Sequence, residues 1–125
     1  MKSLYIFTLL PTAYAPQRLA EEALKVGCDV RLINYDDLSI VLREGDAQIM
    51  YQDNELIVPS ACIFRANKHV AFKDALLNIY VNKKVRILNS ETLKLWQNLD
   101  KCTQHIEFAQ ADIPFVETIL TTSQI

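Results

Sequence analysis

A strand, a helix and a second strand follow one another within residues 1–33, and this order constrains the fold more than any other feature. Leu4–Leu10 is a continuous apolar run, which is typical of a strand buried on both faces of a parallel sheet. Pro16 begins a predicted helix that Gly27 ends, and a second apolar strand covers Cys28–Ile33. A crossover of this length joins parallel strands in the right-handed sense. The unit therefore predicts an α/β fold.

The rest of the chain adds strands and helices of the same kind. In chain order we predict a hairpin within residues 39–58, a strand at Ala61–Phe64, a helix over 68–81 capped by Asn67, a strand at Val85–Leu88, a helix around Leu93–Gln97, a helix from Asp100 and a strand at Phe115–Leu120. These elements predict an open, mainly parallel, Rossmann-like sheet of about four strands, with helices on both faces and an added β-hairpin.

The N-terminus is compatible with two interpretations. Lys2, the apolar run Leu4–Leu10 and Ala13-Tyr14-Ala15 together resemble a secretory signal with a cleavage site. Thr8 interrupts the run and Pro11 stops it, which argues against a signal, and the run also fits a first buried strand. We favour the strand, because removing residues 1–15 would leave the first helix without a strand to pack on. No apolar stretch is long enough to span a membrane, so a cytoplasmic protein is expected.

Charge, glycine and cysteine content exclude several classes of function. The formal net charge of -2 argues against nucleic acid or a membrane surface as a partner. The two glycines, Gly27 and Gly45, lie far apart, which excludes a Gly-rich phosphate loop. Cys28, Cys62 and Cys102 form no metal-ligand pattern, and we expect reduced core residues. His69 and His105 have no histidine partner at helical spacing, so no metal site is expected.

Two basic residues are candidate binding residues. Arg65 follows a buried strand and precedes a predicted helix, where carboxylates or phosphates are commonly held. A structural alternative is that Arg65 pairs with Asp36 or Asp37 at the end of the neighbouring strand. Lys101 lies at the start of a predicted helix, where the helix dipole is already positive. Its side chain either adds positive charge that binds a ligand or is simply solvated.

The order of several short stretches resembles a known family over nearly the whole chain. These stretches are Arg18-Leu19 with Glu22 and Gly27, Val30–Ile33, Asp37-Leu38, Gln48–Tyr51 with Glu55-Leu56, Ala61–Arg65, Leu88-Asn89-Ser90, Asp100-Lys101, Gln104 and Ala111–Pro114. Their order and spacing resemble the N-terminal, pre-ATP-grasp domain of RimK-like ATP-grasp ligases.

The resemblance implies a domain boundary near the end of the chain. Residues 1–114 would form the pre-ATP-grasp domain, and residues 115–125 would begin an ATP-grasp domain. Such ligases use ATP and Mg²⁺ to turn a carboxylate into an acyl phosphate, which an amine then attacks. The catalytic residues and magnesium ligands would lie beyond Ile125, so this chain alone is expected to be inactive and to bind neither cofactor tightly.

The resemblance also assigns candidate site residues. Arg65 would hold a substrate carboxylate, Asn67, Asn89 and Ser90 would contact substrate at the same edge, and Lys101 would face the phosphates of the nucleotide. The acid and amine substrates would be amino acids or peptides, as in glutamate-joining members, and homo-oligomerisation remains open.

Two other functions remain open. The chain could be a stand-alone, non-catalytic binding or regulatory module with a Rossmann-like fold, or a small α/β enzyme of another class. About 150–200 further residues after Ile125, with a Gly-rich loop, would favour the ligase.

Overall fold

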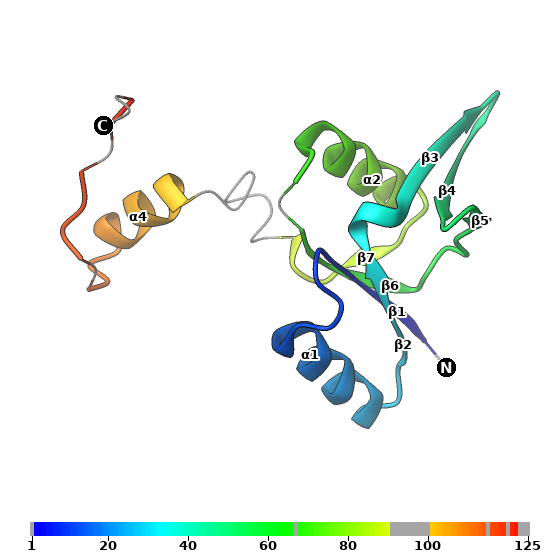
Figure 1. The fold of residues 1–125 in the computed structure, drawn as a ribbon, viewed down its shortest axis with the longest axis horizontal. Helices are drawn as coiled ribbons and strands as arrows, with labels where there is room; N and C mark the ends of the chain where they lie inside the picture. Colours follow the sequence, from blue (N-terminus) through cyan, green and yellow to red (C-terminus); the bar gives the residue numbers. More distant parts are fainter. Residues whose placement is uncertain (1, 67, 91–100, 115, 120, 123–125) are drawn as a thin grey trace. The chain divides into compact units, whose positions relative to one another are not determined.

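The computed structural model describes residues 2–66, 68–90, 101–114, 116–119 and 121–122. The chain divides into two compact units, Met1–Asn89 and Ser90–Ile125. The first unit contains the sheets and the helices α1 and α2, and the second contains helix α4, Lys101–Gln110 (Figure 1).

A four-stranded parallel sheet forms the centre of the first unit. Its strands are β1 (Ser3–Thr8), β2 (Asp29–Asn34), β6 (Ala61–Arg65) and β7 (Arg86–Ile87), in the order β2-β1-β6-β7. Helices α1 (Tyr14–Lys25) and α2 (Val70–Asn82) cover opposite faces (Figure 1), so the predicted α/β fold is confirmed. The strand interpretation of the N-terminal run is also confirmed, because β1 lies between β2 and β6.

The core between the sheet and α2 is built from aromatic rings. Phe7 packs against Phe64 and Tyr80, with ring centroids 5.5 and 5.9 Å apart, and Tyr35 packs against Phe64 and Phe72 at 5.5 and 5.7 Å. Between their terminal residues, the central strands β1 and β6 are apolar because both of their faces are covered. This packing holds the carboxyl ends of the strands in place.

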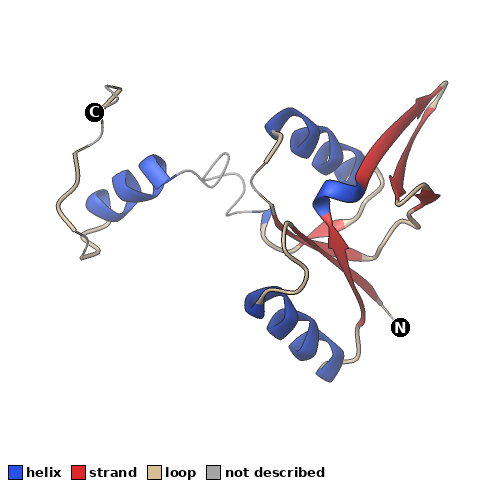
Figure 2. Ribbon diagram, in the orientation of Figure 1, coloured by secondary structure: helices blue, strands red, loops and turns tan. Residues whose placement is uncertain are grey.

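The predicted hairpin is present and belongs to a second sheet. Strands β3 (Leu38–Arg43), β4 (Asp46–Tyr51) and β5 (Asn54–Glu55) form an antiparallel sheet in the order β3-β4-β5 (Figure 2). The turn between β3 and β4 is Glu44-Gly45, and Gly45 supplies the positive φ that it needs. The Tyr51 hydroxyl accepts a hydrogen bond from the Asn34 backbone N–H at 3.3 Å, which ties this sheet to the end of β2.

The helices begin at other residues than predicted. Helix α1 begins at Tyr14 rather than Pro16, because proline is tolerated anywhere in the first turn, where backbone N–H groups have no partner within the helix. Gly27 follows α1 with φ +87°, as predicted for a helix end. Helix α2 begins at Val70 with His69 at its cap, and the predicted cap, Asn67, lies outside the described residues. The Lys68 carbonyl accepts from Tyr35 Oη, and His69 is left-handed, so the helix starts later.

The cysteines are in different environments. Cys62 is fully buried in β6, and this burial raises the pKa of its thiol to about 12. Cys28 is only half-buried, contrary to the core prediction, because it lies between α1 and β2 before the sheet begins. Both thiols are free. The side chain of Cys102 lies outside the described residues.

The second unit departs from one prediction. Helix α4 begins at Lys101, and the helix predicted around Leu93–Gln97 lies outside the described residues. Residues 116–119 form no strand, although a strand was predicted at Phe115–Leu120. A strand needs a neighbour for its backbone hydrogen bonds, and the described part of this unit contains none. In the described chain, no helix is long and apolar enough to cross a membrane.

Candidate functional site

The carboxyl ends of the parallel strands meet at one edge of the sheet. Thr8 at the end of β1 is paired with Asn34 at the end of β2 and with Arg65 at the end of β6. In open parallel sheets, ligands bind beyond this edge, because the loops there present helix N-termini and side chains to a common crevice. The candidate site therefore lies along this edge.

Arg65 lines a hollow between the sheet and helix α1. The hollow has a volume of about 360 Å³, and its lining residues are Tyr14, Ala15, Arg18, Leu19, Glu22 and Arg65. The Arg65 side chain is exposed and forms no ion pair with any residue that the structure describes. A guanidinium has five donors in a fork that matches a carboxylate. Arg65 is thus free to bind an anion at this position.

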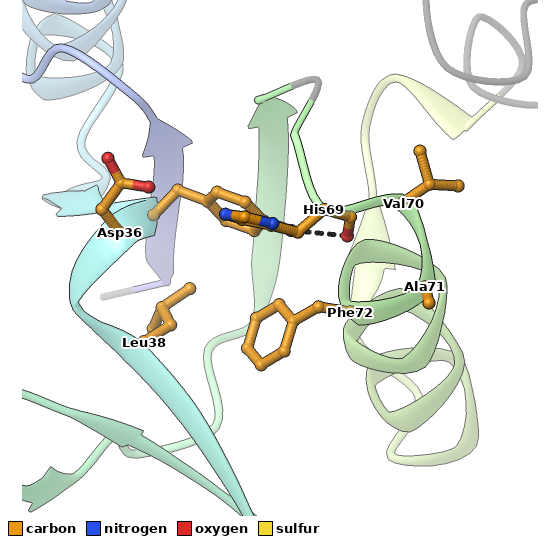
Figure 3. Close-up of a pocket in the computed structure, with 7 residues that line it drawn as sticks. Asp36, Leu38, His69, Val70, Ala71 and Phe72 are labelled. Atoms are coloured by element: carbon orange, nitrogen blue, oxygen red, sulfur yellow. Dashed lines mark hydrogen bonds between the residues drawn. The ribbon is translucent and has the colours of Figure 1, made fainter.

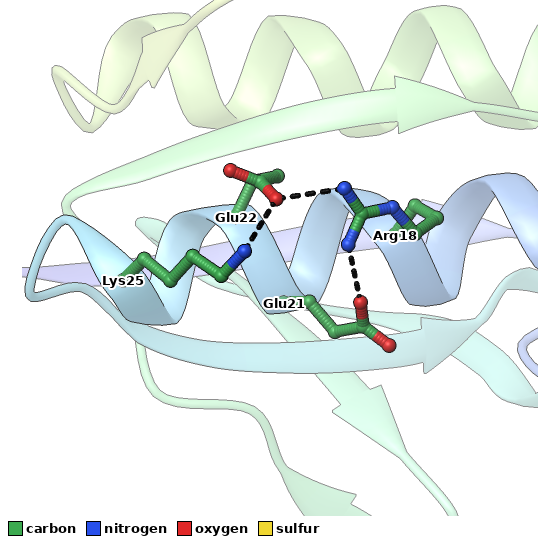
Figure 4. Close-up of polar contacts among 4 residues, drawn as sticks. All are labelled: Arg18, Glu21, Glu22 and Lys25. Atoms are coloured by element: carbon green, nitrogen blue, oxygen red, sulfur yellow. Dashed lines mark hydrogen bonds and ion pairs between the residues drawn. The ribbon is translucent and has the colours of Figure 1, made fainter.

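The other arginine of the hollow is already neutralised. Arg18 donates to Glu21 at 2.6 Å and to Glu22 at 2.8 Å, and Lys25 donates to Glu22 at 2.9 Å (Figure 4). The hydrogen bond to Glu21 and the charge of Glu22 raise the pKa of Arg18. The hydrogen bond from Lys25 and the charge of Arg18 lower the pKa of Glu22. Arg18 is therefore paired within α1, whereas Arg65, the other cation that lines the hollow, has no partner among the described residues.

The structural alternative for Arg65 is wrong. Asp36 pairs instead with Lys68, whose Nζ lies 3.1 Å from Asp36 Oδ1. Asp37 accepts a hydrogen bond from Gln52 Nε2 at 3.3 Å. Both carboxylates belong to the turn after β2, where Asp36 lines a hollow together with the first turn of α2.

Asn89 has a structural role that its sequence context does not reveal. Its Nδ2 donates to the Phe64 carbonyl at 2.8 Å, and its Oδ1 accepts from the Phe64 backbone N–H at 3.1 Å. The amide group therefore bonds to strand β6 much as another strand would, extending the sheet beyond Ile87. Contact of Asn89 with substrate stays a prediction.

The other candidate residues are placed only in part. Ser90 is half-buried and directly follows Asn89. Lys101 is the first residue of α4, and its side chain lies outside the described residues, as does Asn67. Since Arg65 and Lys101 belong to different units, their joint presence at one site stays a prediction.

A larger hollow at the same edge was not predicted. It has a volume of about 580 Å³ and is lined by Tyr35, Asp36, Leu38, His69, Val70, Ala71 and Phe72 (Figure 3). Its walls are the turn after β2 and the first turn of α2, with Tyr35 Oη donating to the Lys68 and His69 carbonyls. The sequence feature that could have predicted this hollow is the polar Asn-Tyr-Asp-Asp segment directly after β2, because ligands bind at the carboxyl ends of parallel strands.

Sequence reasoning also missed Lys73. Its side chain lies on the buried face of α2 with Leu76 and Tyr80, and the residue is only 3% exposed. Residues 73, 76 and 80 share one helix face, so a lysine at that position could have been recognised as a charge within an apolar stripe. Lysine is seldom buried without a partner.

The described residues contain no cluster that suggests a metal site. Within them, no three histidine, cysteine, aspartate or glutamate side chains come together as metal ligands would.

Comparison with known proteins points to a single family. A family model, described as the RimK pre-ATP-grasp domain, matches residues 1–93. No curated protein matches the chain. Among solved structures, the chain is similar to a RiPP-associated ATP-grasp ligase of Chryseobacterium gregarium in complex with ADP and a leader and core peptide. The two are 16% identical, with a TM-score of 0.46, and the similarity covers 89% of this chain and 41% of the ligase.

Proposed function

Because this chain belongs to the RimK pre-ATP-grasp domain family, we propose that it is the N-terminal, substrate-binding domain of an ATP-dependent carboxylate–amine ligase. The observation that supports this most directly is Arg65 at the carboxyl edge of the sheet, exposed in a hollow and unpaired within the described residues. A cation in this setting suits a substrate carboxylate.

In this proposal Arg65 binds the carboxylate through two parallel hydrogen bonds. Residues of α1 form the opposite wall of this hollow, and Tyr14 among them is an exposed aromatic residue. Arg18 is held by Glu21 and Glu22, so the charge of Arg65 is directed at substrate rather than at the protein. Charge-assisted hydrogen bonds of this kind are stronger than neutral ones.

The reaction itself is assigned to residues that this chain does not contain. ATP and Mg²⁺ would activate the carboxylate as an acyl phosphate in the complete enzyme, and an amine would attack it. Asn89, Ser90 and Lys101 would border the same cleft, with Lys101 toward the nucleotide. An amino acid or a peptide, with glutamate as the joined group, is the substrate class that we propose. We also propose that the pre-ATP-grasp domain ends near residue 114 and that the ATP-grasp domain begins there.

Direct binding tests this proposal with the 125-residue chain. We expect L-glutamate to perturb the backbone amide signals around Arg65 in a heteronuclear NMR titration. Losing a charge-assisted contact costs about 1.5–3 kcal/mol, so Arg65→Ala should weaken binding about ten- to a hundredfold. The melting temperature should change little, because Arg65 makes no ion pair with the described residues.

Arg43→Ala is the matched control. Arg43 is also an exposed arginine at the end of a strand, but it lies at the tip of the β3–β4 hairpin, away from the parallel sheet. Its variant should bind glutamate like the original chain. Equal affinity of the Arg65 and Arg43 variants would contradict the proposal, as would a large loss of stability in Arg65→Ala with unchanged binding.

A further inference from the structure

The outer edge of strand β3 is open. Within the described residues, β3 has β4 as its neighbour on one side and no strand on the other (Figure 2). The edge of a strand carries backbone N–H and C=O groups that can bond to a further strand. None of the six residues of β3 is buried, whereas five of the six residues of the central strand β1 are. The edge is therefore accessible to a further strand.

Two hydrogen bonds identify which backbone groups of β3 point outward. The Asp37 carbonyl accepts from the Gln52 N–H at 3.3 Å, so Asp37 faces β4. The Ile49 carbonyl accepts from the Leu56 N–H at 2.8 Å on the far side of β4. Ile40 is the partner of Ile49 in the register, so its own N–H and C=O point away from β4.

These directions alternate along an antiparallel strand, so Leu38, Ile40 and Leu42 all face the open edge. The Leu38 N–H bonds to the Tyr35 carbonyl. The Leu38 carbonyl and both backbone groups of Ile40 and Leu42 have no backbone partner among the described residues. The edge thus presents donors and acceptors in the spacing of a strand.

Helix α2 lies against a face of the hairpin. Leu38 and Ala47 share this face, because Ala47 is paired with Leu42, two strand periods from Leu38. Leu38 lines a hollow with the first turn of α2, and Ala47 lines another with Ile79 and Asn82 at the end of that helix. Since both strands contribute to these hollows, the helix covers the face and not the outer edge of β3.

The β3 edge also lacks the features that normally prevent strand pairing. Residues 38–42 contain neither a charged residue nor a proline. The other described edges are different, because β2 carries Asp29 and Arg31, and β5 and β7 are only two residues long. Leu42 is an apolar residue that is 78% exposed. Among the described edges, β3 is therefore the one suited to pairing.

We propose that β3 pairs with β3 of a second copy of this chain, antiparallel and about a two-fold axis at Ile40. This register places Ile40 opposite Ile40 of the second copy and Leu42 opposite Leu38, so the outward-facing backbone groups meet. The two three-stranded sheets become one continuous sheet. Leu42 is then covered by an apolar neighbour. The proposal does not depend on the ligase assignment.

Charge complementarity favours a second copy as the occupant. The same register brings Arg43 of each copy opposite Asp37 of the other, and opposite charges directly across a strand pair are stabilising. Arg43 has no ion pair with any described residue, and Asp37 accepts a hydrogen bond from the neutral Gln52 side chain. The two neighbouring registers that keep the outward groups facing each other would place Arg43 opposite Ser39 or Tyr35.

The test is sedimentation velocity of the 125-residue chain between about 1 μM and about 1 mM, which spans weak to moderate affinities. We expect a reversible monomer–dimer equilibrium. In the dimer, the amide hydrogens of Ile40 and Leu42 should exchange with solvent more slowly than in the dilute monomer, because they become hydrogen-bonded. A chain that stays monomeric, or a dimer in which these two amides exchange as in the monomer, would overturn the proposal.

Leu42→Lys tests the location of the interface. It places a charge against Leu38 of the second copy and should raise the dissociation constant at least about tenfold, and the monomer should fold because Leu42 is exposed. Ile57→Lys is the matched control, since Ile57 is also 78% exposed but lies outside β3. It should dimerise like the original chain. Unchanged affinity in Leu42→Lys, or an equal loss in Ile57→Lys, would refute the β3 interface.

Charge reversal tests the register. Arg43→Asp and Asp37→Arg should each raise the dissociation constant at least about tenfold, because symmetry creates two like-charged pairs in every dimer. The two substitutions together should restore dimerisation, since opposite charges face each other again. Both residues are exposed, so the monomers should keep their circular dichroism spectra. A double variant that dimerises no better than the single ones would show that Arg43 and Asp37 do not meet.

Discussion

The hydroxyl of Tyr80 is a buried polar group whose removal should stabilise the fold. Tyr80 is 1% exposed, and its Oη is enclosed without a hydrogen-bond partner in the described structure. Burial is also the main reason why the pKa of Tyr80 is raised. An unsatisfied buried hydroxyl costs about 1–3 kcal/mol, so removing it should stabilise the fold.

Tyr80→Phe keeps the ring and its packing on Phe7 and leaves only a gap the size of one oxygen atom. Each lost atomic contact forfeits about 0.1–0.2 kcal/mol, which offsets part of the gain. We therefore expect the free energy of unfolding to rise by about 1 kcal/mol, or the melting temperature by about 4 °C for a domain of this size.

Tyr35→Phe is the matched control. Tyr35 belongs to the same ring cluster and is also buried, but its hydroxyl donates to the Lys68 carbonyl at 2.9 Å. Its loss should destabilise the fold by about 1 kcal/mol. Urea unfolding followed by far-ultraviolet circular dichroism would measure both variants. If Tyr80→Phe destabilises as much as Tyr35→Phe, the Tyr80 hydroxyl is hydrogen-bonded in the folded protein and the reasoning fails.

Two further predictions concern the sheet. Asn89→Ala should lower the free energy of unfolding by about 2 kcal/mol in urea titrations, because two hydrogen bonds to Phe64 are lost; no loss would show that Asn89 is not structural. Since burial raises the pKa of the Cys62 thiol from 9.0 to about 12, the unfolded chain loses this proton first, and stability should fall as pH rises through that window. The decrease is at most about 1.4 kcal/mol per pH unit, and Cys62→Ala should show a shallower decrease in urea titrations at successive pH values.

The fold of the first unit could be predicted because its signals are local. A parallel strand that is covered on both faces must be apolar along its length, and such a run is visible at Leu4–Leu10 and Ala61–Phe64 without any knowledge of the neighbours. Gly27 likewise marks a helix end by its own conformational freedom. The position of Arg65 at the carboxyl edge follows from the same reasoning, since it directly follows a buried strand.

Helix boundaries were less predictable because distant residues set them. The start of α2 depends on Tyr35, which lies more than thirty positions earlier and binds the Lys68 carbonyl. Asn67 has the side chain of a good cap, yet the helix begins after His69. A local preference of about 1 kcal/mol is easily overridden by one tertiary hydrogen bond with its packing.

The surroundings of the candidate residues were decided by the tertiary structure alone. Whether Arg65 is paired depends on where the acids of another loop lie, and Asp36 turned out to bind Lys68. The same holds for Asn89, whose amide completes strand β6, and for Lys73, whose burial requires the sheet beneath it. Sequence alone determined which residue types stand at the ends of strands and helices. Only the folded chain determined which charges are neutralised, because electrostatic pairing acts between groups that are close in space and far apart in sequence.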